Sequence, residues 1–193
     1  GISSEVTALQ IGRFADVLTL EDVPVNQDSI KEQIMEVLKE ATNHFSASRE
    51  KEGENLRSDI LIKLDEMKEN VTFIEERYPA IVSEYRKKLE DKVAELLEDS
   101  NIDESRIAAE VVIYSDKICV DEETVRLKGH IDGMRDELLK GGNVGRKLDF
   151  IAQEMNREAN TILSKANDIE VSDHAIDLKT EIEKIREQVQ NIE

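Results

Sequence analysis

The sequence predicts an all-α protein whose long antiparallel helices form a bundle that ends in a C-terminal helical hairpin. Charged residues make up 36% of the 193 residues and aromatic residues only 4%, with two prolines. A composition rich in Glu, Lys, Leu, Ile and Ala favours long amphipathic helices. Apolar residues also recur in steps of three and four along most of the chain, which is the helical period. No segment gives a convincing strand pattern.

The first hundred residues are expected to form one short helix and one or two long ones. An apolar segment within residues 3–20 predicts a brief helix. Ser29 and Glu32 match a capping box, in which each side chain satisfies the backbone N–H of the other residue. We therefore expect a long helix to start there. Its apolar spacing continues to Tyr78, with an interruption predicted near Gly53 because glycine has poor helix propensity.

Pro79 is expected to break or kink the pattern, since proline removes a helix hydrogen bond. Another helix follows it and ends near residue 100. Two further helices are predicted over residues 104–118 and 121–140. Three consecutive acidic residues at the start of the second of these place negative charge at the positive end of the helix dipole. The sequence "GGNVG" then predicts a turn.

The last two helices are predicted over residues 145–167 and 173–192, with Ser172 as the N-cap of the second. In that second helix, apolar residues from Ala175 to Ile192 alternate steps of three and four without a miss, as in a coiled-coil seam. Two adjacent helices joined by a short connection are expected to pack as an antiparallel hairpin.

The helix over residues 145–167 has contrasting faces. At about 100° per residue, one arc carries the expected core residues, which are Leu148, Ile151, Ala152, Met155, Ala159, Ile162, Leu163 and Ala166. The next arc carries Arg146, Asp149, Gln153, Asn156, Arg157, Asn160 and Ser164, and the remainder carries Lys147, Glu154, Glu158 and Lys165. Asparagine is unfavourable inside a helix, and Phe150 lies among polar neighbours. This face is either solvated or binds something polar, such as another subunit or a phosphodiester backbone.

Two further features bear on nucleic-acid binding. The sequence "GGNVGR" places glycines before a helix N-terminus that opens with Arg146 and Lys147, which makes either an anion site or a simple turn. The formal net charge of −18 argues against a nucleic-acid binder, because such proteins normally present a basic surface. Residues 145–193 hold seven Lys and Arg against eleven Asp and Glu, so any nucleic acid must meet a local patch.

The single cysteine, Cys119, excludes an internal disulfide, and no Cys/His cluster has zinc spacing. Its apolar surroundings favour a packed, reduced thiol. The sequence shows no signal peptide and no apolar run long enough to cross a membrane, so we expect a cytoplasmic location without membrane contact. The chain begins at Gly1 without an initiator Met.

The sequences "VGRKLDFIAQEMNREANTILSKAND" and "AIDLKTEIEKIREQVQNIE" resemble the signature of the YicC/YloC family of bacterial endoribonucleases. Supporting matches are "SREKEGENL" and "VDEETVRLKGHI". The resemblance extends over nearly all of this chain, thins towards residue 1, and corresponds to the C-terminal two-thirds of family members. It divides the chain into residues 1–100, the rest of the family's N-terminal region, and residues 101–193, its C-terminal helical domain.

The resemblance implies a cytoplasmic enzyme that cuts single-stranded or structured RNA internally, depends on Mn²⁺ or Mg²⁺, and assembles as a ring-like hexamer. It also implies links to RNA turnover, which makes other RNA-degrading enzymes possible partners. Family members carry a further N-terminal segment that contains strands. The absence of that segment here puts both the activity and the hexamer formation of this chain alone in question.

Metal-dependent RNA cleavage needs carboxylates that can hold an ion. Glu154 and Glu158 lie one helical turn apart and are candidate metal ligands, with Asp149 as a third. The alternative is that these are surface carboxylates paired with neighbouring cations.

Proton transfer has candidates on the helix that starts at residue 121, where Glu123, Arg126 and His130 share a face. Histidine is the side chain best placed to exchange protons near neutral pH, although a single helical histidine can also be structural. The predicted catalytic residues are thus Glu123, His130, Glu154 and Glu158. The predicted RNA contacts are Arg146, Lys147, Gln153, Asn156, Arg157, Asn160 and Lys165.

Two functions remain in competition at this point. The first is a metal-dependent endoribonuclease that acts as a ring-like homo-oligomer. The second is a non-catalytic helical scaffold, such as an adaptor that recruits an RNA-degrading enzyme. Composition and periodicity alone favour the scaffold, whereas the family-like motifs favour the enzyme.

Overall fold

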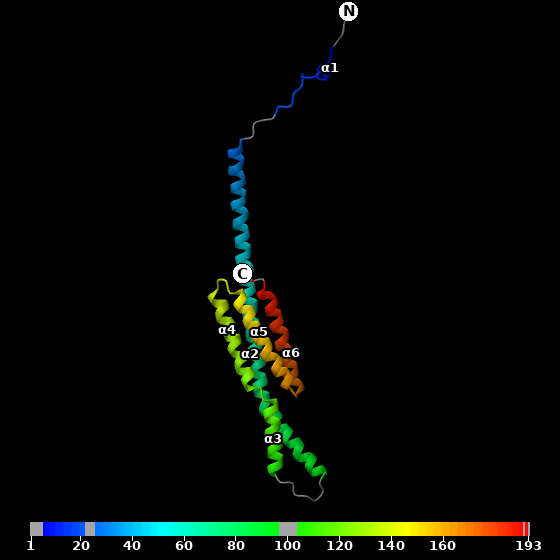
Figure 1. The fold of residues 1–193 in the computed structure, drawn as a ribbon, viewed down its shortest axis with the longest axis vertical. Coiled ribbons are helices and arrows are strands. Elements are labelled where there is room, and N and C mark those ends of the chain that lie inside the picture. Colours follow the sequence, from blue (N-terminus) through cyan, green and yellow to red (C-terminus); the bar gives the residue numbers. More distant parts are fainter. Residues whose placement is uncertain (1–5, 22–25, 97–103, 191, 193) are drawn as a thin grey trace, which may run out of the picture. The chain divides into compact units, whose positions relative to one another are not determined.

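The computed structural model describes residues 6–21, 26–96, 104–190 and 192, and every regular element within them is a helix (Figure 1). The helices are α1 (Ala8–Ile11), α2 (Gln27–Leu96), α3 (Glu104–Ile118), α4 (Asp121–Lys140), α5 (Gly145–Lys165) and α6 (Ile169–Val189). The predicted all-α class is confirmed, and the bounds predicted for α3 and α4 match. No helix in this part of the chain is long and apolar enough to cross a membrane.

α2 is one helix of 70 residues, so of the two alternatives the single helix is confirmed: Gly53 does not interrupt it, and it does not end at Pro79. A glycine inside a helix costs only about 1 kcal/mol relative to alanine, which the strong helix formers around Gly53 offset. At Pro79, the buried Ile74 and Ile81 on either side tie both parts of the helix to the core. Packing therefore holds the helix together across a residue that removes one of its hydrogen bonds.

Two helix starts differ from prediction by about a turn. α2 is capped by Asn26, whose side-chain oxygen accepts the Ser29 N–H at 3.3 Å, and not by Ser29. α6 is capped by Asp168, whose carboxylate accepts the Val171 N–H at 3.1 Å, and not by Ser172. Asn, Asp and Ser are comparable N-caps, and at both places the structure uses an Asn or Asp that precedes the predicted Ser. α1 occupies only four residues of the segment expected to be helical.

The chain divides into two compact units, residues 1–49 and 50–193. In the first unit, the start of α2 exposes apolar side chains at helical spacing. These residues are Ile30, Ile34, Val37, Leu38 and Phe45, which we call the α2 strip. Apolar side chains at such spacing usually face a core, whereas those of the α2 strip are exposed.

The second unit is a four-helix bundle made by the rest of α2 with α4, α5 and α6, which lie side by side in Figure 1. α5 packs against both α4 and α6, and the predicted antiparallel hairpin of the last two helices is confirmed. Each helix contributes fully buried side chains to one core, among them Leu64, Met67, Leu127, Ile131, Leu148, Met155, Leu178 and Ile182.

Polar contacts fix the register of α2 on its neighbours. Lys68 pairs with Asp132 of α4 at 2.5 Å, and Lys128 of α4 pairs with Glu75 further along α2. On α6, Gln188 donates to Asp59 at 2.5 Å and His174 contacts Asn70 at 2.8 Å. In both sets, later residues of α2 meet earlier residues of the partner helix, so α2 is antiparallel to α4 and α6.

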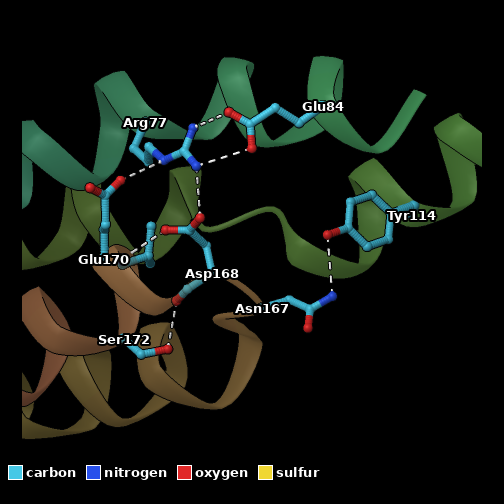
Figure 2. Close-up of polar contacts among 8 residues, drawn as sticks. Arg77, Glu84, Tyr114, Asn167, Asp168, Glu170 and Ser172 are labelled. Atoms are coloured by element: carbon cyan, nitrogen blue, oxygen red, sulfur yellow. Dashed lines mark hydrogen bonds and ion pairs between the residues drawn. The ribbon is translucent and has the colours of Figure 1, made fainter. Parts of the chain in front are cut away.

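Arg77 of α2 joins the start of α6 to the bundle (Figure 2). Its guanidinium donates to both carboxylate oxygens of Glu84, at 2.7 and 3.1 Å, and to Asp168 at 2.8 Å. The Nε atom of Arg77 lies 3.1 Å from the Glu170 carboxylate. One cation thus binds three carboxylates, and two of them, the N-cap Asp168 and Glu170, hold the start of α6 against α2.

α3 is attached to the end of α2 through aromatic residues. The Tyr78 hydroxyl donates to the Ser115 carbonyl at 2.6 Å, and the Tyr85 and Tyr114 rings stack with their centroids 3.6 Å apart. The Tyr114 hydroxyl accepts a hydrogen bond from Asn167 at 3.2 Å, just before α6 (Figure 2). These contacts place the α3–α4 junction next to the end of α5.

Candidate functional site

α5 is oriented as its periodicity predicts. Five of the expected core side chains are fully buried, and the other three are partly buried against the same core. The buried residues are Leu148, Ala152, Met155, Ala159 and Ile162, and the partly buried ones are Ile151, Leu163 and Ala166. The remaining polar side chains face three directions. One group faces α4, Asp149 faces α6, and a third group faces solvent.

The group that faces α4 forms a ladder of ion pairs, which we call the α4–α5 seam. Its residues are Glu123, Arg126, His130 and Glu137 of α4 with Lys147, Glu154, Glu158 and Lys165 of α5. Lys147 lies 2.8 Å from Glu137, Arg126 lies 3.3 Å from Glu158, and Lys165 lies 2.8 Å from Glu123. The fold thus gathers all four predicted catalytic residues, together with two predicted RNA contacts, along one junction between two helices.

Glu123 is a buried member of this seam, with 6% of its surface exposed. Its Oε1 atom accepts from Lys165 at 2.8 Å, and Lys165 also donates to the Cys119 carbonyl at 3.0 Å. The Oε2 atom of Glu123 is buried and has no hydrogen-bond partner among the described residues. Lys165 therefore ties the α3–α4 junction to the end of α5, which gives both residues a structural role.

His130 and Glu154 occupy the middle of the seam. The register set by the Glu137–Lys147 and Arg126–Glu158 pairs places these two predicted catalytic residues opposite each other. Both side chains are partly exposed, and no hydrogen bond or ion pair joins His130 to another described residue. A solvent-accessible histidine is a side chain that can accept and deliver protons in catalysis.

The three predicted metal ligands are not brought together. Asp149 faces α6, where its carboxylate accepts a hydrogen bond from Arg186 at 3.1 Å. It also accepts one from Gln153, on its own helix, at 2.8 Å. Glu154 lies 3.0 Å from Arg157, and Glu158 faces α4, where Arg126 pairs with it. No group of three or more His, Cys, Asp or Glu side chains in the described part of the chain is arranged to hold a metal. Asp149 thus does not join Glu154 and Glu158 in one three-ligand group, and binding of Mn²⁺ or Mg²⁺ by the two glutamates stays a prediction.

The third group points away from the bundle and is exposed. We call it the outer face of α5, and its residues are Arg146, Phe150, Gln153, Arg157, Asn160 and Ser164. Phe150 is 61% exposed among these polar side chains. Asn156 lies beside the outer face, where its side-chain oxygen is 3.5 Å from the amide nitrogen of Asn160. Most of the predicted RNA contacts are therefore accessible together on one helix.

The glycine-rich loop before α5 has structural reasons for its glycines. Gly141 and Gly142 adopt φ values of 69° and 84°, a region that disfavours other residues. A Cβ on Gly145 would lie 2.5 Å from the carbonyl oxygen of Ile192. Carbonyl oxygens from the end of α6 crowd this N-terminus, and their negative partial charge disfavours an anion. The structure therefore favours the interpretation of the loop as a simple turn.

Some residues of this region were not found from the sequence. Glu137 accepts from Lys140 and Lys147, and these hydrogen bonds lower the pKa of its carboxyl. A groove between α5 and α6, lined by Asn156, Leu163, Ile176 and Lys179 among others, was also missed. Both features depend on the register between two helices, whereas periodicity shows only which face of one helix is apolar.

Comparison with known proteins gives the family. The model of the family "Endoribonuclease YicC-like, C-terminal" matches residues 74–193, and that of "Endoribonuclease YicC-like, N-terminal region" matches residues 1–58. The two matches together cover nearly the whole chain and include the family's N-terminal region, so "C-terminal two-thirds" describes the resemblance imprecisely.

Two curated relatives are described as probable endoribonuclease YicC. The protein of Clostridioides difficile is 39% identical over 193 residues, which are 100% of this chain and 66% of the relative. The protein of Haemophilus influenzae is 33% identical over 191 residues, which are 98% of this chain and 64% of the relative. The chain therefore spans less than two thirds of the length of these relatives. It belongs to the YicC-like endoribonuclease family.

Proposed function

We propose that this chain acts in an endoribonuclease that cuts RNA internally, and that the outer face of α5 binds the RNA. Family membership supports the reaction class, because the relatives are described as probable endoribonucleases. The proposal that this face binds RNA rests on one observation, which is that four polar side chains are exposed together beside Phe150. These are Arg146, Gln153, Arg157 and Asn160. Guanidinium and amide groups suit phosphate and base edges, and an exposed aromatic ring can stack on a base.

The α4–α5 seam is proposed as the place of proton transfer. Cleavage of a phosphodiester requires removal of a proton from the nucleophile and its delivery to the leaving oxygen. His130 and Glu154 are the pair in the seam that is accessible for this, since Glu123 is buried against Lys165. Arg157 connects the two surfaces, because it pairs with Glu154 while 75% of its side chain is exposed. A bound phosphate can take Arg157 and leave the Glu154 carboxylate available.

Dependence on Mn²⁺ or Mg²⁺ remains part of the proposal. Glu154 and Glu158 offer two carboxylates one turn apart, and each already has an arginine partner. Water and RNA phosphate would complete the coordination of an ion held by these two carboxylates. The roles proposed for His130, Glu154 and Arg157 do not depend on that ion.

Self-association is proposed as the second element of the function. The α2 strip is an exposed apolar surface at the spacing of a helix–helix contact, and the family resemblance predicts a ring-like hexamer. In a ring, several outer faces would line one channel and concentrate their cations, which would reconcile RNA binding with a net charge of −18. A cytoplasmic location and contact with other RNA-degrading enzymes complete the proposal.

One observation favours a non-catalytic scaffold as the second candidate. Every carboxylate predicted to bind metal has a cationic partner, and the described part of the chain has no three-ligand group. A scaffold would use the outer face of α5 to bind RNA or another subunit without cutting.

The test is cleavage of a covalently closed single-stranded RNA, which only an internal cut can open. The chain would be incubated with this RNA in Mn²⁺ and in EDTA, alongside a Glu154→Gln/Glu158→Gln variant. The matched control is Asp173→Asn/Asp177→Asn, which also neutralises two acidic residues one turn apart on an exposed part of α6. We expect the wild type and the control to linearise the RNA, and the Glu154/Glu158 variant to lose this activity.

Binding of the RNA without linearisation, in Mn²⁺ and at high protein concentration, would contradict cutting by this chain and would favour the scaffold for these helices. Equal cutting by wild type and the Glu154/Glu158 variant would show that the seam carboxylates are not needed. Cutting that persists in EDTA would contradict the metal dependence alone.

A further inference from the structure

We propose that the groove between α5 and α6 holds one unstacked nucleobase of the bound RNA, an inference that rests on the proposed function. The groove has a volume of about 540 Å³. Small-molecule sites in proteins span roughly 300–1,000 Å³, so a base with its sugar fits this space. None of the residues that line it was predicted to be a specificity site, and only Asn156 was a predicted RNA contact.

The groove is continuous with the surface proposed to bind RNA. Asn156 lines it and also lies next to Asn160 of the outer face, 3.5 Å away between side-chain atoms. An RNA strand that follows the outer face of α5 therefore passes the mouth of the groove. Single-stranded RNA is commonly recognised by bases that leave the stack and enter protein sites.

The groove has apolar side chains where the flat surface of a base would rest. Leu163 of α5 and Ile176 of α6 line it. Ile176 is 49% exposed, whereas its neighbours on α6, Ala175 and Leu178, are fully buried in the core. An apolar side chain that is left half-exposed in a hollow gains free energy when a ligand covers it. None of the described residues that line the groove is aromatic, so this contact is one of shape and burial and not of stacking.

Polar groups around the groove match the edges of a base. The Asn156 amide can donate and accept at once, and its hydrogen bond to Asn160 is long enough to be exchanged. Lys179 and Glu183 also line the groove, and neither forms an ion pair with another described residue. Lys179 can meet the phosphate of the bound nucleotide, and Glu183 can accept from an exocyclic amino group. Adenine, guanine and cytosine carry such a group and uracil does not, so the groove should disfavour uracil.

The inference can be tested by binding without cutting. A short single-stranded RNA of uridines with one central 2-aminopurine would be titrated in EDTA, because 2-aminopurine fluorescence is quenched in a stack and rises when the base leaves it. The test variant is Ile176→Gln. The matched control is Ile169→Gln on the same helix, where the side chain is 80% exposed and does not line the groove.

We expect fluorescence to rise several-fold when the wild type or Ile169→Gln binds, with equal affinities. We expect Ile176→Gln to bind about three- to tenfold more weakly, with a smaller rise, because the apolar contact with the base is lost. RNA in which the 2-aminopurine is replaced by an abasic sugar should bind the wild type and Ile176→Gln equally.

Three results would overturn the inference and can be told apart. RNA binding with unchanged fluorescence and no effect of Ile176→Gln would exclude the groove and leave the outer face as the binding surface. A change in the mass of the protein in solution on Ile176→Gln, with unchanged RNA affinity, would show that a second copy fills the groove. Absence of RNA binding by the wild type would overturn the proposed function and this inference together.

Discussion

Replacing Lys165 by methionine tests whether the Glu123–Lys165 pair is structural. The substitution keeps most of the side-chain volume and removes the hydrogen bonds to Glu123, at 2.8 Å, and to the Cys119 carbonyl, at 3.0 Å. It leaves the Glu123 carboxylate 6% exposed without its cation. Breaking a buried ion pair typically costs about 3–5 kcal/mol. Lys165 is 33% exposed, so we expect a smaller loss of about 2–3 kcal/mol in the free energy of unfolding.

Arg157→Met is the matched control, because Arg157 is a cation on the same helix that pairs with Glu154 while 75% of its own side chain is exposed. Exposed pairs contribute about 0–1 kcal/mol, so the two variants should differ clearly in urea unfolding. For a chain of this size, the loss at Lys165 corresponds to a fall of roughly 4–12 °C in Tm. Adding Glu123→Gln to Lys165→Met should recover part of the loss, since the uncompensated charge is removed.

Similar small losses for Lys165→Met and Arg157→Met would refute this reasoning. Lys165 would then be available to RNA, as the sequence predicts, and the contact with Glu123 would be incidental. A large loss at Lys165 without recovery in the double variant would point to the Cys119 carbonyl as the important partner.

Three further predictions concern packing, pH and assembly. Gly145→Ala should destabilise the chain by about 1–3 kcal/mol in urea, because its Cβ meets a carbonyl oxygen at 2.5 Å. Gly133→Ala, with nothing within 4 Å of its Cβ, should instead stabilise it by about 0.5–1 kcal/mol, and a loss at both would contradict the packing. Hydrogen bonds from Arg77 lower the pKa of Glu84 in the folded state, so their stabilisation is present above the ordinary glutamate pKa and lost as pH falls through the lowered pKa. Unfolding at a series of acidic pH values should therefore show a weaker pH dependence for Arg77→Met, and an unchanged dependence would refute the assignment. Ile34→Glu in the α2 strip should lower the mass seen by sedimentation, whereas an unchanged mass would exclude the strip as the contact.

The sequence predicts those features of the fold that depend on the residues of a single helix, which are its bounds and its buried face. The period of apolar residues gave the buried face of α5 from Leu148 to Ile162, and it gave the bounds of α3 and α4. Local rules left open whether Pro79 breaks or only kinks the helix, and α2 continues through this residue. They failed where two residues compete for one role, as Asp168 and Ser172 do for the cap of α6.

The candidate site could be predicted only in part. Periodicity placed Asn160 and Arg157 on one face, and both lie exposed on the outer face of α5. Spacing also grouped Asp149 with Glu154, although these carboxylates face different neighbours, because the register of α5 against α4 and α6 is a tertiary property. The same holds for the pairing of Lys165 with Glu123, which are far apart in sequence. Which helix lies beside a residue decides its chemistry as much as its place on its own helix.

The central claim is that the outer face of α5 binds RNA, and the salt dependence of binding tests it most directly. Fluorescence anisotropy of a labelled single-stranded RNA would be measured over a salt series in EDTA, for the wild type and for Arg146→Gln/Arg157→Gln. The matched control is Lys87→Gln/Lys88→Gln, which removes two exposed cations from α2.

Each lost phosphate contact lowers the slope of log affinity against log salt by about 0.7 for a single strand. The account predicts weaker binding and a slope smaller by about 1.4 for the α5 variant, with the control unchanged. An unchanged slope for the α5 variant, or an equal loss in the control, would show that RNA does not bind this face.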